Sequence, residues 1–87
     1  MTITVELFGI PRSRAGAARV ELEADSLHAL LDELVRRFPD LADECIDSGR
    51  LRAGYLANLN GERFVTDPAT PLRAGDAILI LSADAGG

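Results

Sequence analysis

One amphipathic segment, residues 27–38, constrains the fold more than any other part of the sequence. Its large apolar side chains recur at the spacing that places them on one face of an α-helix: Leu27, Leu30, Leu31, Leu34, Val35 and Phe38. Ser26 is placed to cap the start of this helix, and Pro39 to end it. Because such a face must pack against another element, the pattern predicts one main helix at the centre of the core.

Two segments before this helix, residues 3–7 and 19–23, alternate between apolar and polar residues, which is the pattern of a strand with one side against a core. We expect strands at residues 3–7, 19–23, 55–59, 63–65 and 77–81. Asn60-Gly61 favours a tight reversal between the third and the fourth of these. The last strand (AILIL) is apolar throughout, as in a central strand buried on both faces. The order suits one sheet laid across one helix, an α+β fold.

Three other segments lack this periodicity. Residues 9–18 contain Pro and Gly, so we expect a turn or flexible loop there. Residues 41–47 could form a short second helix or a turn that ends at Ser48-Gly49. Residues 82–87 have almost nothing to bury and should project as a flexible tail. The sequence therefore predicts one domain at residues 1–81, followed by a tail at 82–87.

The balance of charge excludes several classes of partner. Fourteen acidic residues against nine basic ones give the 87-residue chain a net charge of −5. This charge repels nucleic acids and anionic membranes, and it would speed the approach of a basic protein surface. All nine basic residues are arginines, so a Schiff-base lysine is excluded. No stretch is apolar enough to span a bilayer, and the first residues resemble a strand rather than a signal peptide, so we expect a cytoplasmic protein.

Few side chains offer catalytic or metal-binding chemistry. His28 is the only histidine, and we interpret it as a surface residue near Asp32 and Glu33, because a catalytic triad or metal site needs partners. Cys45 is the only cysteine and has no second thiol for a disulfide or a zinc site. We interpret it as a buried or semi-buried structural residue, with a reactive thiol as the alternative. We predict no bound metal.

Two groups of charged residues are expected to lie in solvent. The acidic group could share a helical face but lacks the loop pattern of an EF-hand: Asp40, Asp43, Glu44 and Asp47. The basic group surrounds the first loop without the interleaved aromatic residues of a nucleic-acid site: Arg12, Arg14 and Arg19. For these arginines, contact with an acidic partner or ligand is the alternative.

The C-terminus offers a different chemistry. The chain ends in Gly86-Gly87, and glycine has no Cβ, so such an end can pass through a narrow channel in conformations that other residues resist. A projecting tail could deliver its carboxylate into the active site of another protein. The alternative is a frayed end without function.

The order of elements and three local motifs resemble the ThiS/MoaD family of sulfur carriers. The motifs are Leu59-Asn60-Gly61-Glu62, the run at residues 71–78 (PLRAGDAI) and the terminal Gly86-Gly87. The resemblance covers essentially the whole chain. It implies the β-grasp, ubiquitin-like fold, with a mixed four- or five-stranded sheet packed on the main helix. It also implies that Gly87 carries sulfur and that Gly86 allows the tail to enter the active site of a partner.

The resemblance further implies partners. In that family an E1-like adenylyltransferase uses ATP to join the terminal carboxylate to AMP. Sulfur from a persulfide then displaces AMP and leaves a thiocarboxylate. The chain would therefore be a co-substrate rather than an enzyme, with no cofactor bound to it, and the sheet surface near the tail would dock its partners.

Within the family, the length and the middle of the chain are most similar to the small subunit of molybdopterin synthase. We therefore expect a role in molybdenum cofactor biosynthesis, with a large subunit or another sulfur-accepting enzyme as a further partner. The tail departs from that pattern, because Leu81-Ser82-Ala83-Asp84 has no proline and carries a charge. The alternatives are a sulfur carrier for cysteine, thiamin or secondary-metabolite synthesis, and a ubiquitin-like binding module or protein modifier.

Overall fold

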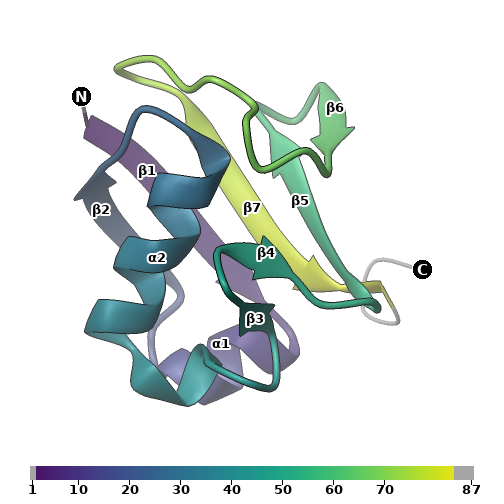
Figure 1. The fold of residues 1–87 in the computed structure, drawn as a ribbon. Helices are drawn as coiled ribbons and strands as arrows, with labels where there is room; N and C mark the ends of the chain where they lie inside the picture. Colours follow the sequence, from purple (N-terminus) through teal and green to yellow (C-terminus); the bar gives the residue numbers. More distant parts are fainter. Residues whose placement is uncertain (1, 84–87) are drawn as a thin grey trace.

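A five-stranded sheet forms one layer of the protein, and helix α2 covers one of its faces (Figure 1). The computed structural model describes residues 2–83. The strands lie in the order β2-β1-β7-β5-β6. Only β1 and β7 are parallel, and the other neighbours are antiparallel, so the predicted mixed sheet is confirmed. The strand bounds are β1 Thr2–Phe8, β2 Arg19–Glu23, β5 Tyr55–Leu59, β6 Arg63–Val65 and β7 Ala77–Ser82.

Helix α2, Leu27–Arg37, begins and ends where its sequence signals predict. The backbone N–H of Ala29 donates to Oγ of Ser26 over 3.1 Å, which satisfies one of the free donors at the helix start. Phe38 is the C-cap residue rather than part of the helix, and the next residue is Pro39. No helix within residues 2–83 is long and apolar enough to cross a membrane.

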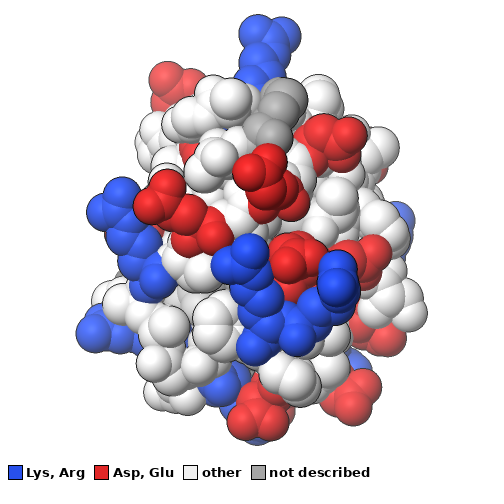
Figure 2. Space-filling model, turned by 90° about the vertical axis from the view of Figure 1, so that its left-hand side faces the viewer, with Lys and Arg blue, Asp and Glu red and all other residues white. Residues whose placement is uncertain are grey.

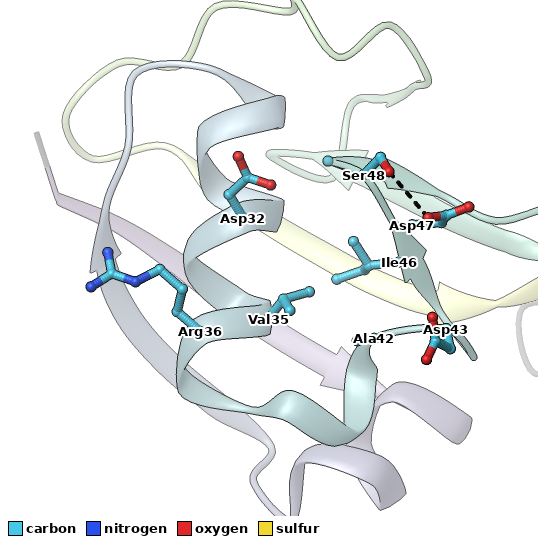
Figure 3. Close-up of a pocket in the computed structure, with 9 residues that line it drawn as sticks. Asp32, Val35, Arg36, Ala42, Asp43, Ile46, Asp47 and Ser48 are labelled. Carbon is cyan, nitrogen blue, oxygen red and sulfur yellow. Dashed lines mark hydrogen bonds between the residues drawn. The ribbon is translucent and has the colours of Figure 1, made fainter.

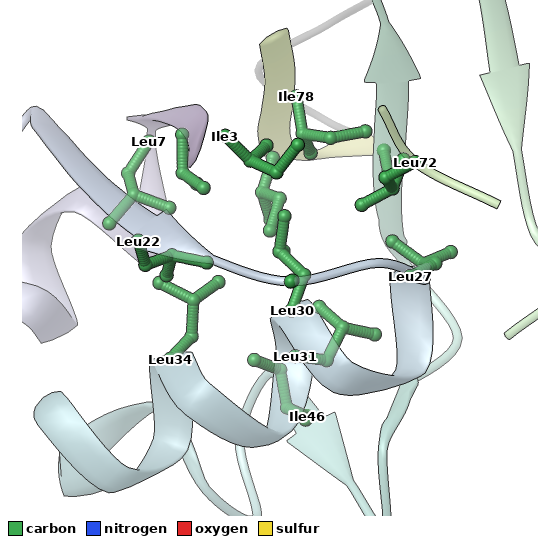
Figure 4. Close-up of a cluster of buried hydrophobic side chains, with 14 of the residues drawn as sticks. Ile3, Leu7, Leu22, Leu27, Leu30, Leu31, Leu34, Ile46, Leu72 and Ile78 are labelled. Carbon is green, nitrogen blue, oxygen red and sulfur yellow. The ribbon is translucent and has the colours of Figure 1, made fainter. Parts of the chain in front are cut away.

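The leucine face of α2 packs on the sheet and forms the centre of the core, as predicted. Figure 4 shows its leucines pointing towards apolar side chains of β1, β2 and β7. Burial of each such side chain contributes about 1.5 to 3 kcal/mol before the entropy of ordering is subtracted. The almost fully buried members of this contact are Ile3, Leu22, Leu27, Leu30, Leu31, Leu34 and Ile78.

Strand β7 lies in the middle of the sheet, and the burial on both faces that we expected is found along only part of it. Ile78 and Ile80 face α2 and are almost fully buried, whereas Leu79 on the opposite side is only partly covered. The outward-facing Leu81 is also buried, at 7% exposed, so β7 is only partly covered on its open side at Ala77 and Leu79. The strand also runs to Ser82, one residue beyond the predicted boundary of the domain. Ser82 is 6% exposed, so the segment expected to be a tail begins with a buried residue.

The expected loop at residues 9–18 contains a short helix, α1, Ile10–Ala15. Pro11 lies in its first turn, where a missing N–H is tolerated, and its side chain is buried. Gly16 closes the helix at a φ of 73°, and its N–H donates to the carbonyl of Arg12 over 2.9 Å. Because α1 is so short and buries little more than one proline, it leaves no apolar periodicity in the sequence.

Of the two alternatives expected at residues 41–47, a short second helix or a turn, the structure contains the turn. A single 3-10 turn, Pro39–Leu41, is followed by two very short antiparallel strands, β3 Ile46–Asp47 and β4 Arg50–Leu51. Ser48 and Gly49 join them, both at positive φ (53° and 74°), as a two-residue hairpin turn requires. The N–H of Cys45 donates to the carbonyl of Leu41, which closes a single turn that does not continue as a helix.

Hydrogen bonds to the Asp76 carboxylate link the turn before β7 to the turn between β5 and β6. Asp76 Oδ1 accepts a hydrogen bond from Nδ2 of Asn60 over 3.0 Å, and its Oδ2 accepts one from the Arg73 N–H over 2.8 Å. The Asn60 amide, followed by the Arg73 amide, holds the pKa of Asp76 below the ordinary value of 3.8. The Oδ1 of Asn60 also accepts from the Ala77 N–H over 2.8 Å, which fixes where β7 begins.

We expect Leu34→Ala to lower the free energy of unfolding by about 2 to 5 kcal/mol, because it leaves a cavity between α2 and the sheet. Urea unfolding followed by circular dichroism measures the change. Arg36→Ala is the matched control, because the Arg36 side chain is 78% exposed on the same helix and should change the free energy by less than about 0.5 kcal/mol. Equal stability of the two variants would show that the buried helix face is assigned wrongly.

Asp76 should make the fold sensitive to acid. A carboxylate whose folded pKa lies below its unfolded pKa stabilises the protein above the unfolded value, and this contribution is lost as the pH falls through the folded value. Asp76→Asn should therefore lower the thermal midpoint at neutral pH, and its deficit relative to the original protein should shrink well below pH 3.8. Glu62→Gln, at an exposed turn residue, is the control for loss of one charge. A deficit that does not change with pH would contradict the role given to Asp76.

Candidate functional site

The described residues with catalytic potential do not come together into a site. His28 lies exposed on α2, with Nε2 3.1 Å from Oδ2 of Asp32, and its surface position is confirmed. Its ring covers Gly49 of the β3–β4 turn so closely that a Cβ on Gly49 would overlap with it. The ring thus has a packing role. Within residues 2–83 there is no group of three or more His, Cys, Asp or Glu side chains arranged to hold a metal ion.

Cys45 is completely buried, which confirms its interpretation as a structural residue. Burial raises the pKa of its thiol above the ordinary value of 9.0, although a hydrogen bond with Tyr55 opposes this shift. A neutral, buried thiol is a poor nucleophile. Cys45 therefore does not provide the reactive sulfur of a catalytic site.

The acidic residues of the 40–47 region do not share a helical face, because the helix that would align them is absent. Glu44 instead links two elements, since Oε1 accepts from Nη2 of Arg14 over 3.0 Å and Oε2 accepts from the Tyr55 hydroxyl over 2.9 Å. Burial first, and then the hydrogen bond to Glu44, raise the pKa of Tyr55 to about 12. Tyr55 therefore stays a neutral donor. Arg14 and Arg12 lie on α1 and Arg19 begins β2, all three exposed.

A hollow of about 430 Å³ lies between α2 and β3. Figure 3 shows Val35 pointing across it towards Ile46, whereas Arg36 extends away to the far side of the helix. Its rim carries the carboxylates of Asp32, Asp43 and Asp47. On its rim the Ser48 hydroxyl donates to Oδ1 of the adjacent Asp47 over 3.2 Å, and both side chains are exposed. An exposed hydroxyl–carboxylate pair without a third, orienting group does not form an activated nucleophile, so we do not assign this hollow as an active site.

The charged side chains are mixed over the surface that carries α2 and β2. Figure 2, which views this side, shows acidic and basic groups interleaved. Part of the mixing is local pairing, as in the contacts of Glu33 with Arg36 and Arg37, each 3.1 Å long. The described residues therefore form no continuous basic surface on this side of the kind that binds nucleic acids.

The open face of the sheet carries a group of apolar side chains, which we call the open-face patch: Phe8, Leu56, Phe64, Leu79 and Leu81. The register places Leu81 directly beside Phe8 on β1 and Leu56 on β5, and all three point away from α2. Phe8 is 47% exposed and Phe64 is 59% exposed. Leu56 and Leu79 are partly covered, and Leu81 is buried between its neighbours. Exposed aromatic residues on a sheet face next to such leucines are typical of a protein-binding surface.

The open-face patch reaches the point where the described chain ends. Ser82 pairs with Tyr55, and the N–H of Ala83 donates to the Gly54 carbonyl over 2.7 Å. The last described residues are thus hydrogen-bonded to the start of β5. Gly86 and Gly87, the predicted access residue and the predicted sulfur-carrying residue, lie outside the described residues. The sequence predicts docking on the sheet near the tail but identifies none of the patch residues. Outward-facing apolar positions in the strands are the available signal.

Comparisons with known proteins identify the family. A model of the ThiS family matches residues 5–87, while no curated protein matches the sequence. Among solved structures, the small archaeal modifier protein SAMP1 from Haloferax volcanii is 25% identical, with a TM-score of 0.83 and all of both chains covered. A putative molybdopterin converting factor subunit 1 from Pyrococcus furiosus is 22% identical, with a TM-score of 0.78 over 94% of this chain and 97% of that one.

A third similar structure was solved with a partner. The Amycolatopsis orientalis BexX/CysO complex contains a chain that is 22% identical to this one, with a TM-score of 0.80 over 98% of this chain and 99% of that one. These likenesses agree with the observed sheet order and main helix, and they identify the fold as the ubiquitin-like β-grasp fold. The family match extends over nearly the whole sequence. The chain belongs to the ThiS family, whose members are small ubiquitin-like sulfur carriers.

Proposed function

We propose that this protein carries sulfur as a thiocarboxylate on Gly87 and gives that sulfur to a partner enzyme. The observation that supports this most directly is the extent of the family match, which runs to the last residue and so includes Gly86-Gly87. The chain acts in this proposal as a co-substrate: the body of the protein docks, and the terminal carboxylate reacts.

The proposed chemistry takes place in the active site of an E1-like adenylyltransferase. A carboxylate oxygen of Gly87 attacks the α-phosphorus of ATP, pyrophosphate leaves, and a mixed anhydride with AMP forms. The terminal sulfur of a donor persulfide then attacks the activated carbonyl and releases AMP. A thiol next attacks the donor sulfur of the resulting acyl disulfide, so that a disulfide remains on the donor side and the thiocarboxylate is freed. Adenylation is needed because a carboxylate oxygen is otherwise a poor leaving group.

The open-face patch is the proposed docking surface for these partners. It is apolar and contains two exposed phenylalanines, and it lies on the strands that end beside the departing tail. A partner seated on it would hold the tail within reach of an active site and so reduce the entropic cost of the reaction. The BexX/CysO structure shows that a protein of similar fold forms a complex with a partner protein, which supports this part of the proposal.

For the destination of the sulfur we favour molybdenum cofactor biosynthesis, with this chain as the small subunit of a molybdopterin synthase. The support is the likeness in fold to a putative molybdopterin converting factor subunit together with the resemblance of the chain's middle region. Delivery to cysteine, thiamin or a secondary metabolite uses the same thiocarboxylate. If the protein purifies with the large subunit of a molybdopterin synthase from the same organism, and the pair converts the pterin substrate, the sulfur goes to molybdenum cofactor biosynthesis.

A second candidate function is attachment to other proteins as a modifier. The observation that favours it is the likeness to the small archaeal modifier protein, at 25% identity over the whole chain. Both functions begin with adenylation of the same carboxylate. They differ in the product, because a modifier would form an amide bond to a lysine of a target protein. Mass spectrometry of target peptides for a Gly-Gly remnant separates them.

If Gly87 carries the sulfur, its free carboxylate must be the terminal group. Incubation with the cognate activating enzyme, ATP and a persulfide donor should exchange one oxygen for sulfur on the C-terminal peptide, as read by mass spectrometry. Deletion of Gly87, or addition of one alanine after it, should abolish the exchange. Gly86→Ala should slow it, because a Cβ would crowd a channel shaped for glycine.

The thermal midpoint of each of these tail variants is the control for folding. It should stay close to that of the original protein, since none of the changes touches the core. Modification of the shortened or extended chain at the original rate would overturn the assignment to Gly87. An unmodified original chain would overturn the carrier function itself.

The docking role of the open-face patch predicts a loss of affinity when charge is introduced there. Phe8→Glu should raise the KM for this protein in adenylation about tenfold or more, because it places a charge in a desolvated contact. The free protein should lose little stability, since the ring is 47% exposed. Ala74→Glu adds the same charge at an exposed residue in the turn before β7 and should leave the KM unchanged. Equal effects of the two variants would exclude local docking at Phe8.

A further inference from the structure

One polar side chain on the open face, that of Asn58, has a shielded acceptor without a hydrogen bond to the described residues. Asn58 lies on β5 between Leu79 of β7 and Phe64 of β6, and the register places all three on the face that points away from α2. Its Oδ1 is shielded from solvent, yet it accepts no hydrogen bond within residues 2–83. A shielded acceptor without a donor is unfavourable for the free protein. Asparagine is also a poor residue for the interior of a strand.

The neighbouring Asn60 shows what a structural asparagine looks like in this protein. Its Nδ2 donates to Asp76, and its Oδ1 accepts from the Ala77 N–H, so both ends of the amide are used. Asn58 is two residues earlier on the same strand and has no such contacts. The difference indicates that the amide of Asn58 is not present to hold the sheet together.

A hollow of about 310 Å³ lies beside Asn58. Glu6 of β1 and Leu79 of β7 also line it, and Leu79 pairs with Glu6 on one side and with Asn58 on the other. Glu6 is exposed and forms no ion pair with the described residues. The hollow thus combines an unpaired carboxylate, an unpaired amide and an apolar side chain between them. The terminal torsion of asparagine is soft, so the amide can turn to present its oxygen to a bound group.

We propose that this hollow receives a cationic side chain, an arginine or lysine, from the activating enzyme that docks on the open face. The cation would pair with the Glu6 carboxylate and donate to Oδ1 of Asn58, while its aliphatic part would lie against Leu79. A guanidinium group suits the site best, because its several N–H donors diverge and can reach two acceptors. The net charge of −5 favours the approach of such a partner. This inference rests on the proposed sulfur-carrier function and names a contact that would give its docking surface specificity.

The first test compares stability with activation in Asn58→Leu. Leucine has a similar volume and no unpaired oxygen, so the thermal midpoint of the free protein should stay the same or rise. The KM for the protein in ATP-pyrophosphate exchange by the cognate activating enzyme should rise roughly 10- to 100-fold, as expected for loss of a hydrogen bond to a charged group. The kcat at saturation should be unchanged. A marked fall in the midpoint, or an unchanged KM, would overturn the proposal.

The second test determines whether the partner's group carries a positive charge. Asn58→Asp keeps the acceptor and adds a negative charge, so a cationic partner predicts a KM that is unchanged or lower. A higher KM for Asn58→Asp would show that the partner's group is not a cation and would overturn the proposal. Glu6→Gln should raise the KM more than Glu21→Gln, which removes the same charge from an outward position on β2. Equal effects of these two would mean that only the overall charge is recognised, and would also overturn the proposal.

The outcome for the original protein separates this inference from the proposed function. If the original chain supports ATP-pyrophosphate exchange and Asn58→Leu has the same KM, the inference about Asn58 is wrong but the sulfur-carrier function stands. Absence of any exchange with the original, folded chain would remove both.

Discussion

The parallel pairing of β1 with β7 is the interaction on which the rest of the structure depends. It joins the first strand of the chain to the last, with Val5 beside Ile78 and Leu7 beside Ile80. These residues form the floor on which the leucines of α2 pack. Because β7 is thereby central, its end lies between the end of β1 and the start of β5. The same pairing that completes the core therefore places the departing chain beside the apolar side chains of Phe8 and Leu56.

The division of labour in the proposed function follows from this arrangement. The interior of the domain is filled by side chains, its one thiol is buried, and its one histidine packs over a turn. What the described residues offer a partner is a surface: the open-face patch and the hollow at Asn58. A carrier of this kind needs a rigid body that an enzyme can recognise and an end that it can modify. The recognition surface and the modified end can then be changed separately by substitution.

Sequence periodicity predicted the parts of the fold that bury long apolar faces. The stripe from Leu27 and the alternation in β1 and β2 are strong because many side chains must point the same way. Helix α1 was missed because its ends are set by backbone conformation at Gly16 rather than by an apolar face. Strands β3 and β4 were missed because two-residue strands are too short to alternate. The open-face patch could not be assembled from sequence, because Phe64 becomes its member only when strand pairing is known.

The most direct test of the account compares the whole protein with its own end. A synthetic peptide of residues 82–87 has the same terminal glycines but lacks the sheet and its open face. In ATP-pyrophosphate exchange with the cognate activating enzyme, the account predicts that the folded protein is adenylated at far lower concentration than the peptide, with AMP on Gly87 in both. Equal concentration dependence for protein and peptide would contradict the claim that the folded body is what the enzyme recognises, and AMP on any other group would contradict the claim that Gly87 reacts.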